Sequence, residues 1–99
     1  MLGDESAVQK AANEVMDGFD VQRISIARGG KAALARDGSG QIMLIKRHGN
    51  RFAGRLLDSK SSVREQVDTL IVDSGEIRFG EVRLSIDDPG FWADAINRL

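Results

Sequence analysis

The chain opens with apolar residues at helical spacing. Within residues 1–20, four apolar side chains recur every three or four positions: Val8, Ala12, Val15 and Phe19. This spacing places them on one side of a helix. Ser6 and Gln9 have the separation of a capping box, and Gly18 suits the left-handed backbone that ends many helices. The pattern predicts an N-terminal helix within 1–20 whose apolar stripe packs on another part of the fold.

Residues 21–58 alternate between apolar and polar positions, which is typical of strands. Four segments show this pattern: 21–28, 31–36, 41–47 and 51–58. Three short sequences that suit tight turns separate them: Gly29-Gly30, the DGSG at 37–40 and the HGN at 48–50. The region therefore predicts a meander of four antiparallel strands.

Residues 63–86 predict a second set of strands after a polar connection, DSKSS. The stretch 66–73 predicts one continuous strand. Ile77 and Phe79 share a face, but the apolar positions after Gly80 have the opposite parity. This phase shift predicts a bulge or a tight turn between two short strands at the glycine.

The last segment, 88–99, returns to helical spacing. Asp88 is a favourable N-cap and Pro89 suits the first helical position. The apolar positions that follow lie on one side of a helix: Trp92, Ala95, Ile96 and Leu99. We therefore predict a C-terminal helix that buries Trp92 against the strands.

Together these elements predict an α+β fold class. A bent antiparallel sheet of six to seven strands, or a half-open barrel, lies between the two helices, and the C-terminal helix packs on it. Ninety-nine residues suit one domain, since domains cluster at about 100–150 residues. Its parts are the helix in 1–20, the four-strand meander in 21–58, the second set of strands in 63–86 and the helix in 88–99.

One known fold family has a similar order of elements. A meander of strands followed by a C-terminal helix with the pattern W-x-x-x-I resembles the pleckstrin-homology superfold, and Trp92 and Ile96 in FWADAINRL have this spacing. The resemblance covers about residues 21–99 and concerns architecture. It implies a barrel whose open end is plugged by the helix, with the tryptophan in the core. Many such domains bind phosphoinositides through basic loops longer than RGGK, so we do not carry this activity over.

Charge is distributed unevenly along the chain. Residues 1–20 have an excess of four negative charges, and residues 65–99 have an excess of five. Between them, residues 21–64 carry ten Lys or Arg against Asp37 and Asp58, an excess of eight positive charges. The acids of 65–99 can pair with these arginines within the molecule, or the basic face can meet an acidic partner. We expect the first arrangement for most charges, because pairing within one chain has no association cost.

Composition excludes several classes of protein and site. The chain has no cysteine, which excludes disulfides, thiolate zinc sites and cysteine nucleophiles. No apolar stretch approaches the roughly 20 residues of a membrane span, and the acidic N-terminus does not look like a signal peptide. We therefore expect a cytoplasmic protein. Asp87-Asp88 and the DGSG loop lack the further ligands of a metal site, so we expect neither a metal nor a cofactor.

The only histidine lies in a sequence that resembles a catalytic motif. Arg47-His48-Gly49 follows an apolar strand and resembles the start of the histidine phosphatase superfamily, in which the histidine takes a phosphoryl group. That chemistry needs several groups around the phosphoryl, and this chain has no second histidine. Gly49-Asn50 also suits a plain turn. We expect His48 to be catalytically idle; the alternative is an enzyme fragment that acts on phosphoesters around residues 47–49.

Basic residues gather around two of the predicted turns. The first and third turns of a meander lie at the same end of the sheet, which brings six side chains near one another: Arg28, Lys31, Lys46, Arg47, His48 and Arg51. Such a cluster can hold phosphate or carboxylate oxygens. The alternatives are solvated turn residues or pairs with the C-terminal acids. Of five aromatic residues only Phe52 lies in the basic block, so we do not expect a nucleic-acid partner.

The sequence thus predicts a non-catalytic binding or regulatory module. The basic turns at 28–31 and 46–51 are the predicted binding surface. Its partner would be an anionic ligand or an acidic protein, and a second copy of the chain, as in a homodimer, is one such protein.

Overall fold

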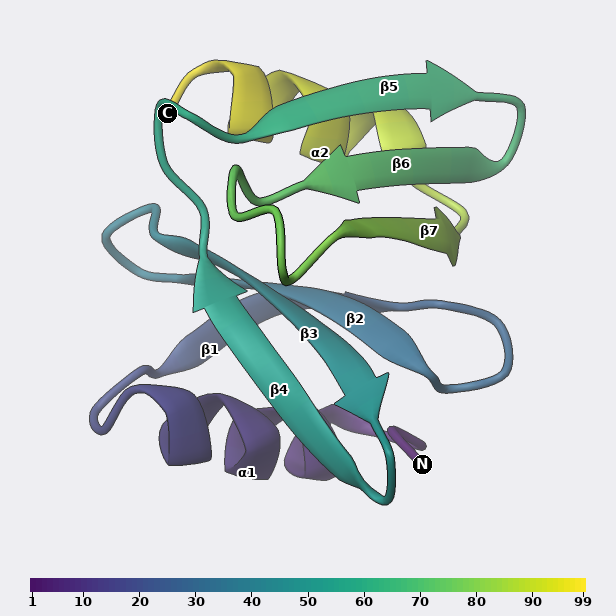
Figure 1. Ribbon diagram of the computed structural model, residues 1–99. Helices are drawn as coiled ribbons and strands as arrows, with labels where there is room; N and C mark the ends of the chain where they lie inside the picture. The colour runs from purple at the N-terminus through teal and green to yellow at the C-terminus, as the bar shows by residue number, and fades with distance from the viewer.

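The computed structural model describes residues 1–99, which form two helices and seven strands (Figure 1). The elements are α1 (Glu5–Val15), β1 (Val21–Ile26), β2 (Ala32–Asp37), β3 (Ile42–His48), β4 (Arg51–Leu56), β5 (Ser62–Gln66), β6 (Thr69–Asp73), β7 (Glu81–Ser85) and α2 (Pro89–Asn97). All strand pairs are antiparallel. The predicted α+β class is therefore confirmed.

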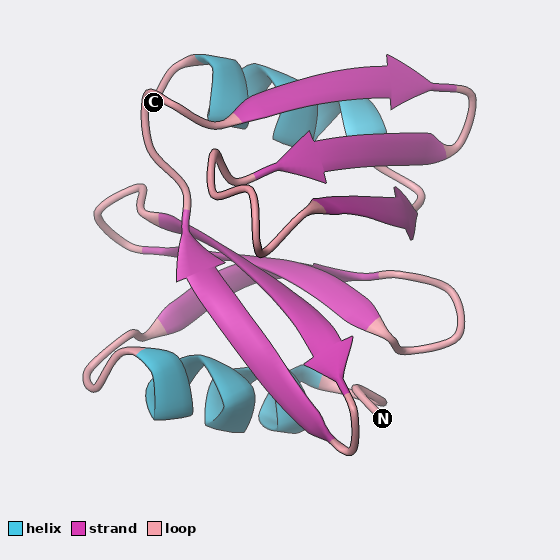
Figure 2. Ribbon diagram, in the orientation of Figure 1, coloured by secondary structure: helices cyan, strands magenta, loops and turns pink.

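The strands form two sheets that do not close into a barrel. One sheet has four strands in the order β1-β2-β3-β4, and the other has three in the order β5-β6-β7. Figure 2 shows α1 on the far side of the four-stranded sheet from the three-stranded sheet, and α2 behind β5 and β6. The four-stranded sheet is therefore covered on both faces.

Strand alternation builds two apolar cores from alternate residues of the same strands in the four-stranded sheet. Neighbouring side chains of a strand point to opposite faces, so Leu44 lies in the core between the sheets and Ile45 in the core beneath α1. Both are fully buried. The strand β3 has four successive apolar residues because each of its two faces packs against one of these cores.

The core between the sheets also contains α2, while α1 closes the second core. Large members of the first core are Leu34, Leu44, Leu70, Val72, Leu84 and Trp92. Large members of the second core are Leu2, Val8, Phe19, Met43 and Ile45. Trp92 is 0% exposed, which confirms the predicted burial of this side chain.

The predicted cap of the N-terminal helix is wrong. Asp4, not Ser6, is the N-cap, and its carboxylate accepts a hydrogen bond of 2.9 Å from the backbone N–H of Ala7. Gln9 does not complete a capping box. Its side chain donates to the carbonyl of Phe19 at 2.6 Å and accepts from the backbone N–H that begins β1 at 2.9 Å. This glutamine therefore fastens α1 to the chain that follows it.

The predicted strand at 66–73 is wrong at its start. It is divided by a two-residue hairpin turn, Val67-Asp68, that joins β5 to β6. Asp68 takes the left-handed backbone of this turn with a φ of 56°, a conformation that Asp tolerates better than most residues. Val67 is 90% exposed at the tip. An apolar residue at a hairpin tip gives no turn signal, so the break is invisible in the hydrophobic pattern.

The predicted short strand around Ile77 and Phe79 is also wrong. Residues 74–80 form a loop in which Ile77 is 98% exposed and Phe79 is buried. Gly80 has a φ of 77° and β7 begins directly after it. The chain does turn before this glycine, whose N–H donates to the carbonyl of Glu76 at 3.2 Å, but the turn belongs to the loop and does not join two strands as predicted.

A chain of polar contacts joins α2 to β1. The indole N–H of Trp92 donates to the hydroxyl of Ser25 at 2.8 Å, and that hydroxyl donates to the carboxylate of Asp88 at 2.7 Å. Arg23 pairs with the same carboxylate at 3.1 Å. Asp88 thus occupies the N-cap position as predicted, but its side chain makes no capping bond. The carboxylate instead ties the start of the helix to the edge of the four-stranded sheet.

The two helices are short. Neither is long and apolar enough to cross a membrane.

Candidate functional site

Ion pairs join the basic part of the chain to its acidic C-terminal part. The structure has four of them: Arg23–Asp88, Arg28–Asp87, Arg55–Glu76 and Arg64–Glu81. Each takes its arginine from residues 21–64 and its acid from residues 65–99. Pairing within the molecule therefore occurs, but it engages four of the ten Lys or Arg residues of 21–64 and does not cover most of these charges, as had been expected. The pairs are largely exposed, so each contributes at most about 1 kcal/mol to stability.

The six basic residues predicted as one cluster lie in different places. Arg28 pairs with Asp87 at 2.6 Å and is therefore engaged within the chain. Arg47 lies on the α1 side of β3, opposite Phe52 of β4, and its Nε–H donates to the carbonyl of Gly49 at 2.8 Å. The two turns are adjacent as expected, because the backbone N–H of Arg47 donates to the carbonyl of Lys31 at 2.8 Å.

Lys46 and His48 share the other face of β3, which is turned toward the three-stranded sheet. They line a hollow of about 280 Å³ that we call the basic hollow. Its lining residues are Lys46, His48, Ala53, Arg55, Arg78 and Phe79. Strand alternation places the first two together, and the β3–β4 register sets Ala53 opposite Lys46. The small alanine leaves room between the cationic side chains.

Phe79 organises the cations of the basic hollow. The ammonium group of Lys46 donates to the carbonyl of Phe79 and lies 4.4 Å from the centre of its ring. The guanidinium of Arg55 lies 4.8 Å from the same ring centre and pairs with Glu76. Cation–π contacts of this kind hold a charge in place without neutralising it. With His48 neutral, the hollow and Glu76 together keep an excess of two positive charges.

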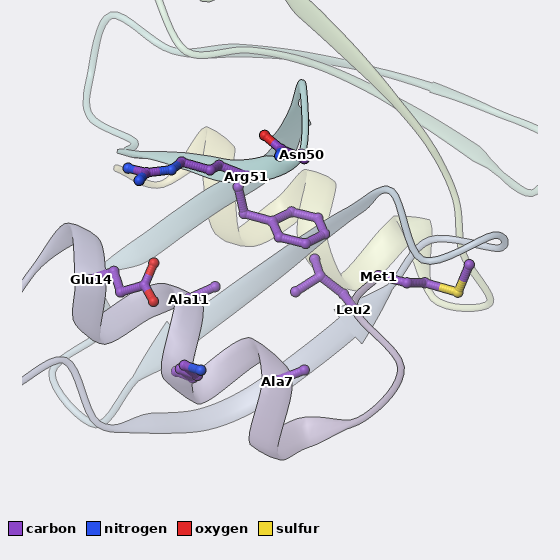
Figure 3. Close-up of a pocket in the computed structure, with 9 residues that line it drawn as sticks. Met1, Leu2, Ala7, Ala11, Glu14, Asn50 and Arg51 are labelled. Carbon is purple, nitrogen blue, oxygen red and sulfur yellow. The ribbon is translucent and has the colours of Figure 1, made fainter.

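Arg51, the sixth predicted residue, borders a different cavity. A groove of about 530 Å³ separates α1 from the tip of the β3–β4 hairpin (Figure 3). We call it the α1 groove. Its lining residues are Met1, Leu2, Ala7, Lys10, Ala11, Glu14, Asn50, Arg51 and Phe52. In Figure 3 the methyl groups of Ala7 and Ala11 point from the helix into the groove.

Three residues of the basic hollow escaped the sequence analysis. Arg55 was assigned to a strand but not to the site, although its parity in β4 is that of Ala53, which lines the hollow. Arg78 and Phe79 come from the 74–80 loop, which the hydrophobic pattern predicts as a strand. Strand parity could have found the first residue. No local signal places the loop against β3 and β4.

The arrangement of Arg47 and His48 differs from that of a phosphoryl-transfer motif. Adjacent strand residues point to opposite faces, and here Arg47 lies on the α1 side while His48 lines the basic hollow. The two side chains therefore do not converge on one phosphoryl group. No group of three or more His, Cys, Asp or Glu is placed to hold a metal ion.

Comparison with protein-family models, curated proteins and solved structures gives no match for this chain. The resemblance to the pleckstrin-homology superfold therefore stays a prediction, and the closed barrel that it implies is absent because the two sheets remain separate.

Proposed function

We propose that this protein is a non-catalytic binding module that takes an anionic ligand in the basic hollow. One observation carries the proposal. After the intramolecular ion pairs have formed, the hollow still gathers Lys46, Arg55 and Arg78 with His48 around one cavity, against the single carboxylate of Glu76. Like charges repel at this range, so their convergence favours an anion that neutralises them.

The size and the donors of the hollow favour a phosphate or phosphoryl group. A volume of about 280 Å³ admits a small anion with some of its water. Arginine forks match phosphate oxygens with two parallel hydrogen bonds, and lysine acts on them as a point charge. Arg78 is exposed and belongs to none of the four ion pairs. It can therefore turn toward a ligand without breaking a contact of the fold.

NMR titration with inorganic phosphate and pyrophosphate tests this proposal. At low salt, the amide signals of residues 46–48, 53–55 and 78–80 are expected to shift before any others. Binding should weaken steeply as salt is added, because screening acts on exposed charges. Arg78→Gln should weaken binding several-fold. Arg98→Gln, which removes an exposed arginine directly after α2 and outside the hollow, is the matched control and should leave the affinity unchanged.

Four results would overturn or redirect the proposal. Amides of the hollow that stay unmoved by both anions at low salt would reject the site, as would equal effects of the two arginine variants. Binding of polyglutamate without binding of phosphate would assign the hollow to an acidic protein surface. Hydrolysis of a generic phosphoester that disappears in His48→Ala would show that the protein is an enzyme and not a binding module.

A further inference from the structure

The floor of the α1 groove is apolar, and α1 contributes only small side chains to it. Ala7 and Ala11 are one helical turn apart and face the hairpin (Figure 3), while Leu2 and Phe52 complete the floor. Leu2 is only 2% exposed, and Phe52 is partly buried against the core beneath α1. Larger side chains at the alanine positions would fill the space between helix and hairpin. The cavity therefore depends on two specific residues.

Charges of both signs border this floor at one end. Glu14 of α1 and Arg51 of β4 lie above the same end of the groove in Figure 3, and Leu2 lies toward the other. Neither Glu14 nor Arg51 takes part in any of the four ion pairs. Lys10 adds a second cation to the rim. The groove thus offers an unpaired carboxylate, an unpaired guanidinium and an apolar surface in one cavity.

We infer that the α1 groove binds a free α-amino acid with an apolar side chain. Such a molecule carries an ammonium and a carboxylate on one carbon and an apolar group on the same carbon. Its ammonium would pair with Glu14, its carboxylate with Arg51, and its side chain would cover the floor at Ala7 and Ala11. A simple anion leaves the carboxylate of Glu14 unmatched, and a simple cation leaves Arg51 unmatched. A zwitterion satisfies both.

The dimensions of the groove agree with this assignment. Its volume of about 530 Å³ falls within the range of about 300–1,000 Å³ that is usual for small-molecule sites. An aromatic amino acid fits with some of its water. The groove shares no lining residue with the basic hollow. The inference is therefore independent of the proposed function, and each can fail without the other.

Calorimetric titration of the whole chain with L-phenylalanine and three relatives tests the inference. N-acetyl-L-phenylalanine lacks the ammonium, L-phenylalaninamide lacks the carboxylate, and glycine lacks the apolar group. The N-acetyl compound and the amide are expected to bind at least about tenfold more weakly than L-phenylalanine, because one hydrogen-bonded charge contributes about 1.5–3 kcal/mol. Glycine should also bind at least about tenfold more weakly, because it has no side chain to bury against the apolar floor. NMR should show the shifts at residues 7–14 and 50–52.

Variants of the rim separate the two charge contacts. Glu14→Gln should weaken the binding of L-phenylalanine but not that of N-acetyl-L-phenylalanine, because the acetylated compound has no ammonium that could pair with Glu14. Arg51→Gln should remove the preference for L-phenylalanine over its amide. Ala11→Leu should abolish binding by filling the floor, with circular dichroism to show that the variant folds. Glu5→Gln, which removes an acid of α1 outside the groove, is the control and should bind as the natural chain does.

The outcomes decide the inference in both directions. It is overturned if none of the amino acids binds at millimolar concentration, if the N-acetyl compound binds as tightly as L-phenylalanine, or if Glu14→Gln weakens both ligands equally. Binding of phosphate that is lost in Arg78→Gln but kept in Glu14→Gln bears only on the basic hollow.

Discussion

The two helices cover opposite sides of the fold, and they are held there by different kinds of side chain (Figure 2). The helix α2 inserts the largest residue of the chain, Trp92, which is fully buried. The helix α1 meets the β3–β4 hairpin with Ala7 and Ala11, and a groove remains between them. A large side chain makes one helix part of the core. Small side chains make the other helix one wall of a cavity.

The polar contacts that fasten the two helices also differ, although each set of contacts includes a residue of β1. Trp92, Ser25 and Asp88 form a chain of side-chain hydrogen bonds that continues to Arg23. On the other side, the amide of Gln9 alone reaches two backbone groups. The comparison teaches that β1 anchors both helices, and that α2 is the more tightly coupled of the two.

The largest expected effect is that of Trp92→Ala. Removing this side chain should lower the free energy of unfolding by about 3–5 kcal/mol, because a large cavity opens between the sheets. Val8→Ala, at an equally buried position of α1, should cost clearly less because fewer atoms are removed. Urea denaturation followed by circular dichroism measures both. Equal costs for the two variants would contradict the difference between the helices.

A smaller effect is expected for Ser25→Ala. This change leaves the indole N–H of Trp92 and one oxygen of Asp88 without their partner, which should cost about 1–3 kcal/mol. Gln9→Ala should cost less, since its backbone partners lie near a turn that water can reach. Ser62→Ala, on the exposed β5, serves as the control. A loss of stability in Gln9→Ala that exceeds the loss in Ser25→Ala would reverse the comparison.

The smallest expected effect is that of Gly54→Ala, at the point where α1 crosses β4. A Cβ at this position would lie 2.8 Å from Cγ2 of Val15 and 3.2 Å from the sulfur of Met43. Both side chains can yield in part, so a cost of about 1 kcal/mol is expected, at the lower end of overpacking effects. Val15→Ala removes the nearer atom. In a double-mutant cycle, it should therefore be less destabilising in the Gly54→Ala variant than in the natural chain. Strictly additive effects would show that α1 does not pack closely at this glycine.

The sequence predicts those parts of the fold in which at least one face of an element is apolar. The helices and the four-strand meander are of this kind. β5 is different because Val63 is its only apolar residue, and its other side chains are charged or polar. It is a strand because it pairs with β6. Its pattern alone gives no reason to separate it from the polar connection before it.

The sites were predicted less completely than the fold, for two physical reasons. Turn proximity brought Lys46 and His48 into the predicted cluster, but it also added Arg28 and Arg47, which the structure engages elsewhere. Strand parity would have separated Arg47 from its two neighbours. Long basic side chains reach their partners through tertiary contacts that the local pattern does not encode. The α1 groove depends on how a helix crosses a hairpin, and the alanines that create it look like ordinary helix residues.

The ion pairs between the basic and acidic parts of the chain have a consequence for the order of synthesis. The arginines at 23–64 leave the ribosome before the acids at 76–88 that pair with them. During this interval a strongly basic nascent segment faces ribosomal RNA, a polyanion that attracts it. The inner face of the four-stranded sheet also lacks its cover until β5–β7 and α2 have followed. The core between the sheets is therefore expected to form only after the C-terminal segment has left the ribosome, whereas the core beneath α1 contains no residue of that segment.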